Sequence, residues 1–153
     1  MTTQEQTELR VTHHFNASRE DVFDAWIDPG LLRRWWAADP SWDDALAEVD
    51  AREGGRYRLS MREGQGGAVH TVVGEYTEIK RPERLAYTWE WEGGPEEMRG
   101  SEATQVVVEF NEANGGTEVV LTHTGFANDA IRDEHTKGWN AVLANLENKI
   151  FAS

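Results

Sequence analysis

Residues 129–150 carry an apolar stripe of helical period, and they follow a run of segments in which hydrophobicity alternates at every second residue. A helix rises 1.5 Å per residue, so this segment would be about 33 Å long, enough to cross a whole sheet. A long helix after consecutive antiparallel strands predicts an α+β chain whose sheet curls around that helix. The stripe consists of Ile131, Trp139, Val142, Leu143, Leu146 and Ile150.

Alternation is strictest from Leu85 to Trp91, where every second residue is apolar or aromatic and the residues between are small or polar. This pattern is typical of a strand with one buried face. The sequence Asn114-Gly115-Gly116 is a strong signal for a hairpin between the last two alternating segments. We therefore predict a curved antiparallel sheet of six to seven strands, at about residues 9–15, from 47 onward, 55–62, 68–80, 85–92, 103–112 and 117–124.

Two short helices are predicted after the first strand. Ser18 is a suitable N-cap for the first, and Asp28-Pro29 ends it and begins the second, which runs to about Trp36. Gly138 lies in the middle of the long C-terminal helix, where glycine costs about 1 kcal/mol relative to alanine. We expect a close approach of that helix to the sheet at Gly138 to offset the cost.

Nothing in the sequence divides the chain into several units. No period of 20–50 residues repeats, and no Pro- or Ser-rich linker interrupts the pattern. A chain of 153 residues with 39% hydrophobic residues is long enough to bury one sizeable core. The expected organisation is a single domain over residues 7–153, preceded by a flexible N-terminus at residues 1–6.

Charge and composition limit the partners of the protein. It has 28 acidic and 15 basic residues, a net charge of −13, which repels phosphate backbones and anionic lipids. We therefore expect neither a nucleic acid nor a membrane as a partner. The chain has no run of 18 apolar residues, no apolar segment of a signal peptide, and no cysteine. These features favour a cytoplasmic location.

Five segments in a fixed order resemble one known family. They are VTHHFNASREDVFDAWIDPGLLRRWWA, EGGRYRLSM, GEYTEIKRPERLAYTWEW, GGTEVVLTHTGF and HTKGWNAVLANLE, and together they cover about residues 9–150. The series resembles the homologues of the activator of heat-shock protein 90 ATPase, within the START/Bet v 1-like (SRPBCC) superfamily. The resemblance implies a helix-grip fold, in which a curved antiparallel sheet wraps around the C-terminal helix and encloses a mostly apolar cavity.

Strand parity predicts which residues would line such a cavity. Apolar and aromatic positions of one parity share a face on each strand, and aromatic walls with a few polar tips are typical of pockets for small apolar ligands. The alternative is that these rings simply fill the core. The candidate wall residues are Trp36, Tyr57, Leu59, Tyr76, Tyr87, Trp89, Trp91, Val108, Leu121, His123, Phe126, His135, Trp139 and Leu143.

Catalytic residues are harder to predict. His123 and His135 are candidates for a general acid and base, with Tyr87 as a phenol donor, if they face the interior. The simpler alternative is that each histidine is bonded to neighbouring groups and has a structural role. No G-x-S-x-G or G-x-x-x-x-G-K-[ST] motif is present. The sequence therefore does not favour an enzymatic function.

No metal or other cofactor is expected. His13 and His14 are adjacent on a predicted strand, so they point to opposite faces and cannot chelate one ion together. The chain has no H-E-x-x-H motif and no thiolate.

Three functions remain open from the sequence. The first is binding of a hydrophobic or aromatic small molecule in a cavity of several hundred Å³ between the sheet and the C-terminal helix. The second is a cyclase, aromatase or hydrolase acting in that cavity. The third, implied by the resemblance alone, is stimulation of a chaperone ATPase of the heat-shock protein 90 type. The sequence does not distinguish a monomer from a homodimer.

Overall fold

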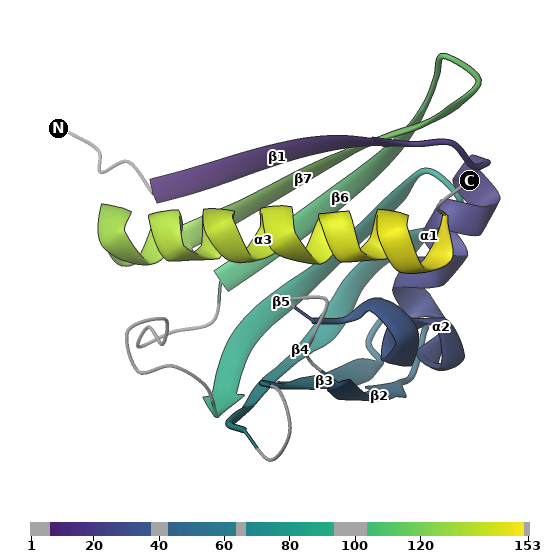
Figure 1. Ribbon diagram of the computed structural model, residues 1–153. Helices are drawn as coiled ribbons and strands as arrows, with labels where there is room; N and C mark the ends of the chain where they lie inside the picture. Colours follow the sequence, from purple (N-terminus) through teal and green to yellow (C-terminus); the bar gives the residue numbers. More distant parts are fainter. Residues whose placement is uncertain (1–6, 38–42, 64–66, 94–103, 152–153) are drawn as a thin grey trace, which may run out of the picture.

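The strands form one antiparallel sheet of seven strands, in the order β1-β7-β6-β5-β4-β3-β2, and the C-terminal helix lies across it (Figure 1). The computed structural model describes residues 7–37, 43–63, 67–93 and 104–151, so the predicted flexible N-terminus lies outside the described residues. The elements are β1 (Thr7–Phe15), α1 (Arg19–Ile27), α2 (Pro29–Trp35), β2 (Asp43–Val49), β3 (Arg56–Arg62), β4 (Val69–Lys80), β5 (Arg84–Gly93), β6 (Thr104–Ala113), β7 (Gly116–Phe126) and α3 (Asp129–Ile150).

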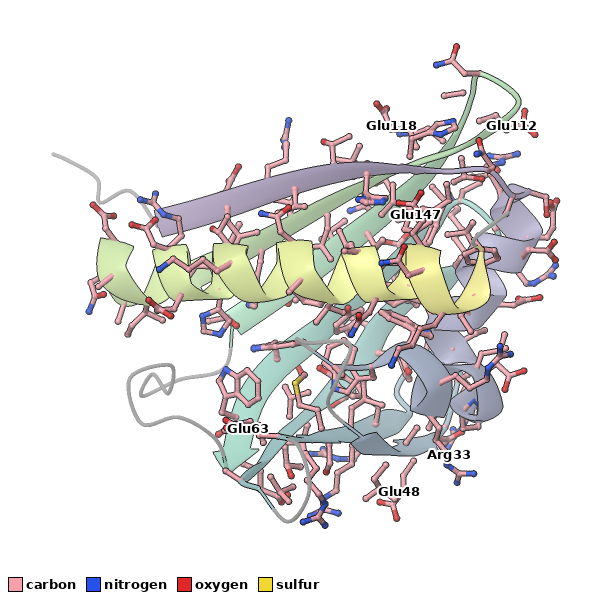
Figure 2. The ribbon with its side chains drawn as sticks, in the orientation of Figure 1. Arg33, Glu48, Glu63, Glu112, Glu118 and Glu147 are labelled. Carbon is pink, nitrogen blue, oxygen red and sulfur yellow. The ribbon has the colours of Figure 1, made fainter. Side chains whose placement is uncertain are left out.

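The helix α3 spans residues 129–150, as its apolar period predicts. The side chain of Asn128 caps it by accepting a hydrogen bond from the amide of Ile131 at 2.9 Å. His13 on β1 bonds to Glu147 on α3 at 2.7 Å, and Figure 2 labels this carboxylate beside the helix. The helix is thus joined to the edge of the sheet as well as packed on its face.

Both short helices begin where their capping residues predict. The hydroxyl of Ser18 accepts a hydrogen bond from the amide of Asp21, and Asp28 accepts one from Gly30 at 2.8 Å. The proline that follows Asp28 occupies the first helical position of α2. In Figure 1 α1 and α2 lie together at one end of the sheet. That end therefore has a helical cover separate from α3.

Parity along β5, β6 and β7 is confirmed. Tyr87 and Trp89 on β5 are 6% and 5% exposed, and His123 on β7 is fully buried. Residues of the other parity are mostly exposed or half-buried, because the antiparallel sheet has only one face covered by helices. Trp91 is half-buried, so the inner face of β5 becomes more accessible toward the end of this strand.

The hairpin between β6 and β7 is also confirmed. Asn114 and Gly115 connect the two strands with φ values of 51° and 78°, both in the left-handed region. Two successive positive φ angles match the twist of an antiparallel pair, and Asn-Gly adopts them at low cost.

The expected close approach at Gly138 is wrong. A Cβ atom built on this residue would meet nothing within 4 Å, so the helix does not need glycine there for packing. We predict that Gly138→Ala raises the free energy of unfolding by about 1 kcal/mol, because alanine lowers the backbone entropy of the unfolded chain and favours the helix. Urea unfolding would measure it, and an unchanged or lower midpoint would contradict the prediction.

Among the helices that the structure describes, none combines the length and the apolar character that a membrane span requires.

Candidate functional site

Indole rings fill the space between the sheet and the middle of α3. The centroid of the Trp89 ring lies 5.0 Å from that of Trp139 and 5.9 Å from that of Trp36, and the centroids of Trp36 and Trp139 are 5.8 Å apart. Trp91 joins the group through Trp89, at a centroid distance of 5.4 Å. All four tryptophans are among the residues predicted to line the cavity, and the structure brings them together in one group. Their mutual contacts make this region a packed layer.

His123 lies at the centre of a chain of hydrogen bonds next to this layer. The indole of Trp139 donates to His123 Nδ1 at 3.1 Å. An indole N–H can only donate, so His123 Nδ1 is an acceptor and the proton is on Nε2. That proton is directed to Thr104 Oγ1 at 2.6 Å, and the Thr104 hydroxyl donates to the carbonyl of Trp89 at 3.2 Å. One imidazole thereby connects β5, β6, β7 and α3.

His135 has a matching arrangement on α3. Trp91 Nε1 donates to His135 Nε2 at 2.9 Å, and His135 Nδ1 donates to the carbonyl of Ile131 at 2.9 Å. The ring of Phe126 packs against both imidazoles, with its centroid 4.4 Å from that of His123 and 4.8 Å from that of His135. Each histidine thus has one donating and one accepting nitrogen.

Burial sets the charge of both histidines. It lowers the pKa of His123 well below the usual value of 6.5, and neighbouring His135 lowers it further. Burial also lowers the pKa of His135. Both rings are therefore neutral at neutral pH, and every ring nitrogen already has a partner. A general base needs a nitrogen that is free to take a proton. The geometry of His123 and His135 therefore fits a structural role better than a catalytic one.

A small cavity lies at the other side of the Trp36 ring, under α1 and α2. Its volume is about 10 Å³, enough for one water molecule. The prediction of several hundred Å³ between the sheet and the C-terminal helix is not met by this cavity, because indole and imidazole rings occupy the space beneath α3 and the cavity faces α1 and α2 instead. The residues that line it are Trp26, Leu32, Trp36, Tyr57, Leu59, Tyr76 and Tyr87.

Three tyrosines form one side of the cavity, at a bend in the sheet. The ring centroid of Tyr57 lies 5.5 Å from that of Tyr76 and 5.3 Å from that of Tyr87. The Tyr57 hydroxyl reaches across β4 and donates to the carbonyl of Thr88 on β5. It passes over Gly74, where a Cβ atom would come within 2.6 Å of the Tyr57 ring and 2.0 Å of that carbonyl. Glycine is therefore required at this point of β4.

We predict that Gly74→Ala lowers the free energy of unfolding by about 2 kcal/mol, because the methyl group must displace the Tyr57 ring or separate β4 from β5. Urea unfolding would measure the loss. Gly138→Ala is a matched control, since the same added methyl meets no atom there. Equal midpoints for Gly74→Ala and the wild type would contradict the prediction.

The predicted wall residues fall into three groups. Five of them, Trp36, Tyr57, Leu59, Tyr76 and Tyr87, line the cavity. The aromatic layer under α3 contains Trp89, Trp91, His123, Phe126, His135 and Trp139, and the fully buried Val108, Leu121 and Leu143 belong to the hydrophobic core. Trp26 and Leu32 were missing from the predicted wall. Both belong to the two short helices, Trp26 to α1 and Leu32 to α2, and strand parity does not apply to helices.

Polar groups around the cavity are few. Trp26 Nε1 donates to Tyr87 Oη at 3.3 Å, which joins α1 to β5. In the part of the chain that the structure describes, the buried Trp36 Nε1 has no hydrogen-bond partner, and the same is true of Trp89 Nε1. The charged residues labelled in Figure 2, such as Arg33, Glu48 and Glu118, lie around the outside of the ribbon. Within the described ranges, no three His, Cys, Asp or Glu side chains come together as metal ligands.

A curved antiparallel sheet that holds a C-terminal helix over an aromatic interior defines the helix-grip class of START/Bet v 1-like proteins. The family model described as Activator of Hsp90 ATPase homolog 1-like protein matches residues 16–150, and the chain belongs to this family.

Solved structures agree with this assignment. Protein CV1439 from Chromobacterium violaceum has a TM-score of 0.79 at 23% identity, with 96% of this chain and 99% of that one covered. The AHSA1-like protein from Aeromonas hydrophila has a TM-score of 0.73 at 26% identity, covering 94% and 92%. PFC0360w, an HSP90 activator from Plasmodium falciparum, has a TM-score of 0.68 at 26% identity, covering 92% and 94%. No curated protein matches the chain.

Proposed function

We propose that this protein binds a hydrophobic or aromatic small molecule at the cavity beneath α1 and α2. The observation that carries the proposal is the composition of the wall, in which α1, α2, β3, β4 and β5 contribute only aromatic and aliphatic side chains. Small-molecule sites are typically concave and apolar, with a few polar groups that orient the ligand. The phenols and indoles of this wall are such groups.

Binding requires the wall to move, because the cavity of about 10 Å³ is smaller than any aromatic ligand. Leu32 and Leu59 are its two aliphatic residues, and their rotamers can change without breaking a hydrogen bond. Trp26 and Tyr57, by contrast, donate hydrogen bonds that hold their rings in place. We therefore place the expansion at Leu32 and Leu59.

Native mass spectrometry of the protein purified gently from its own cells tests the proposal, followed by a thermal-shift screen with fatty acids, sterols and aromatic compounds. A ligand at 100 times its Kd should add about 2.7 kcal/mol of stability and raise the Tm by several degrees. A co-purified mass or such a shift supports the proposal. An empty protein whose Tm no compound changes would contradict it.

A variant that fills the cavity locates the site. Leu59→Phe places a larger side chain in the wall, so it should abolish the shift caused by any compound found in the screen. Leu46→Phe introduces the same substitution on β2 at a residue that is 37% exposed, and it should keep the shift. If Leu59→Phe lowers the Tm too far for the assay, Leu32→Phe fills the cavity from the helical side. If a compound still bound to both Leu59→Phe and Leu32→Phe, its site would not be this cavity.

A chaperone partner is a second candidate, favoured by the match to the family model and by the 26% identity to the Plasmodium falciparum HSP90 activator. The test is the rate of ATP hydrolysis by the heat-shock protein 90 chaperone of the same cells, measured with increasing amounts of this protein. A saturable rise that an equal amount of serum albumin does not produce would support this function. An unchanged rate at high excess would exclude it.

A further inference from the structure

We infer that the ligand of this cavity is an uncharged molecule that accepts hydrogen bonds, of the class of aromatic ketones and quinones. The inference rests on the proposed function and adds the chemistry of the ligand. It comes from hydrogen-bond donors on the cavity wall that have no acceptor in the described part of the chain.

Trp36 supplies the first donor. Its side chain lines the cavity and is 2% exposed, yet its Nε1 has no hydrogen-bond partner among the described residues. A buried N–H without an acceptor loses the hydrogen bond that it made to water in the unfolded chain, which is an unfavourable state for the folded protein. A ligand oxygen placed against the indole would remove this penalty.

Tyr87 supplies the second donor. Its oxygen accepts the hydrogen bond of Trp26 Nε1, and among the described residues no hydrogen bond donated by this hydroxyl is found, so its own proton is left for a ligand. Tyr57 differs, because its proton is already directed to the carbonyl of Thr88. Two residues that line the same small cavity, Trp36 directly after α2 and Tyr87 on β5, thus carry an N–H and an O–H donor for a ligand.

The absence of charge on this wall decides against ionic ligands. No acidic or basic side chain is among the lining residues, and burial raises the pKa of both Tyr76 and Tyr87, so these phenols keep their protons. A carboxylate would enter an apolar site without a cation to pair with, which is costly. A hydrocarbon would leave both donors unsatisfied. An uncharged carbonyl compound avoids both penalties.

The test compares two probes of nearly the same shape, 1-indanone, which has a carbonyl group, and indane, which has a methylene in its place. Each is titrated into the whole protein and followed by the indole N–H signals in two-dimensional NMR. The chain has seven tryptophans, and Trp36→Phe identifies the signal of Trp36. We expect 1-indanone to bind at least about fivefold more tightly than indane and to shift the Trp36 N–H signal downfield, because one hydrogen bond to a buried donor is worth about that factor.

Variants show whether the donors cause this preference. Trp36→Phe and Tyr87→Phe should each reduce the ratio of the two Kd values toward one. The matched control is Trp35→Phe, since Trp35 does not line the cavity and its Nε1 donates to the carbonyl of Ala25. It should keep the wild-type ratio. The ratio is informative for any variant that remains folded, because a general loosening of the wall changes both Kd values together.

Each outcome decides a separate question. Tighter binding of 1-indanone that Trp36→Phe or Tyr87→Phe removes supports the inference. Equal binding of the two probes would overturn it and leave the proposed function intact. Preferential binding of tetramethylammonium, which aromatic cages bind through their ring faces, would overturn it in favour of a cationic ligand. If none of the probes binds, the inference fails, and an empty protein in the mass spectrometry and thermal-shift screen would remove the proposed function as well.

Discussion

Replacing His123 with alanine is expected to lower the free energy of unfolding by about 4 kcal/mol. The imidazole is fully buried, so its removal leaves a cavity next to Leu121 and Phe126. It also deprives Trp139 Nε1 of its acceptor and removes the hydrogen bond that the Thr104 hydroxyl accepts from the imidazole. A buried donor left without a partner costs about 1–3 kcal/mol in addition to the lost packing. Urea unfolding followed by tryptophan fluorescence would measure the change.

His14→Ala is the matched control for this prediction. His14 is exposed on β1, where its Nε2 donates to the carbonyl of Ala113 at 2.9 Å. Its removal creates no cavity and leaves that carbonyl open to water, so the expected loss is below about 1 kcal/mol. If both substitutions lowered the free energy of unfolding by similar amounts, the prediction that the buried hydrogen bonds of His123 stabilise the fold would be wrong.

Acidification below pH 6.5 is expected to destabilise the protein well before its carboxylates titrate. In the unfolded chain a histidine takes up a proton near pH 6.5, whereas burial lowers the pKa of both His123 and His135 in the folded state. The unfolded state therefore binds more protons as the pH falls, and stability present above pH 6.5 is lost below it. Each histidine contributes up to about 1.4 kcal/mol per pH unit.

Urea unfolding at pH 7.5, 6.5, 5.5 and 5.0 would show the decline in stability. His135→Gln removes one of the two titrating groups, so the stability of this variant should fall less steeply than that of the wild type below pH 6.5. The difference between the two slopes of stability against pH gives the contribution of His135 alone. Parallel curves for the two proteins would contradict the prediction.

The order and type of the elements follow from local features of the sequence. The caps at Ser18 and Asp28, the hairpin residues Asn114 and Gly115, and the period of residues 129–150 each specify an element through interactions within a few residues. The family resemblance agreed with this order, and the family is now established by the match over residues 16–150. Strand parity also predicted correctly that His123 is buried, because successive side chains on a strand alternate between faces.

The site was predictable only in part. Parity places Tyr57, Tyr76 and Tyr87 on the inner surface of the sheet, and these residues do line the cavity. It does not tell which inward residues contact one another and which leave a gap. That depends on tertiary contacts such as the one at Gly74, where the absence of a side chain lets the Tyr57 hydroxyl donate to the carbonyl of Thr88 on β5.

What the sequence by itself determined was therefore the list of elements, their order and the inner face of each strand, since these depend on local periodicity. Only the tertiary structure decided how the inner faces are filled. Beneath α3 each of two indoles donates to an imidazole, which fixes the proton position on each imidazole ring, and a small cavity lies beneath α1 and α2. Packing of this kind joins residues more than sixty positions apart, such as Trp26 and Tyr87, through their shapes and hydrogen-bond directions, and no local pattern encodes these.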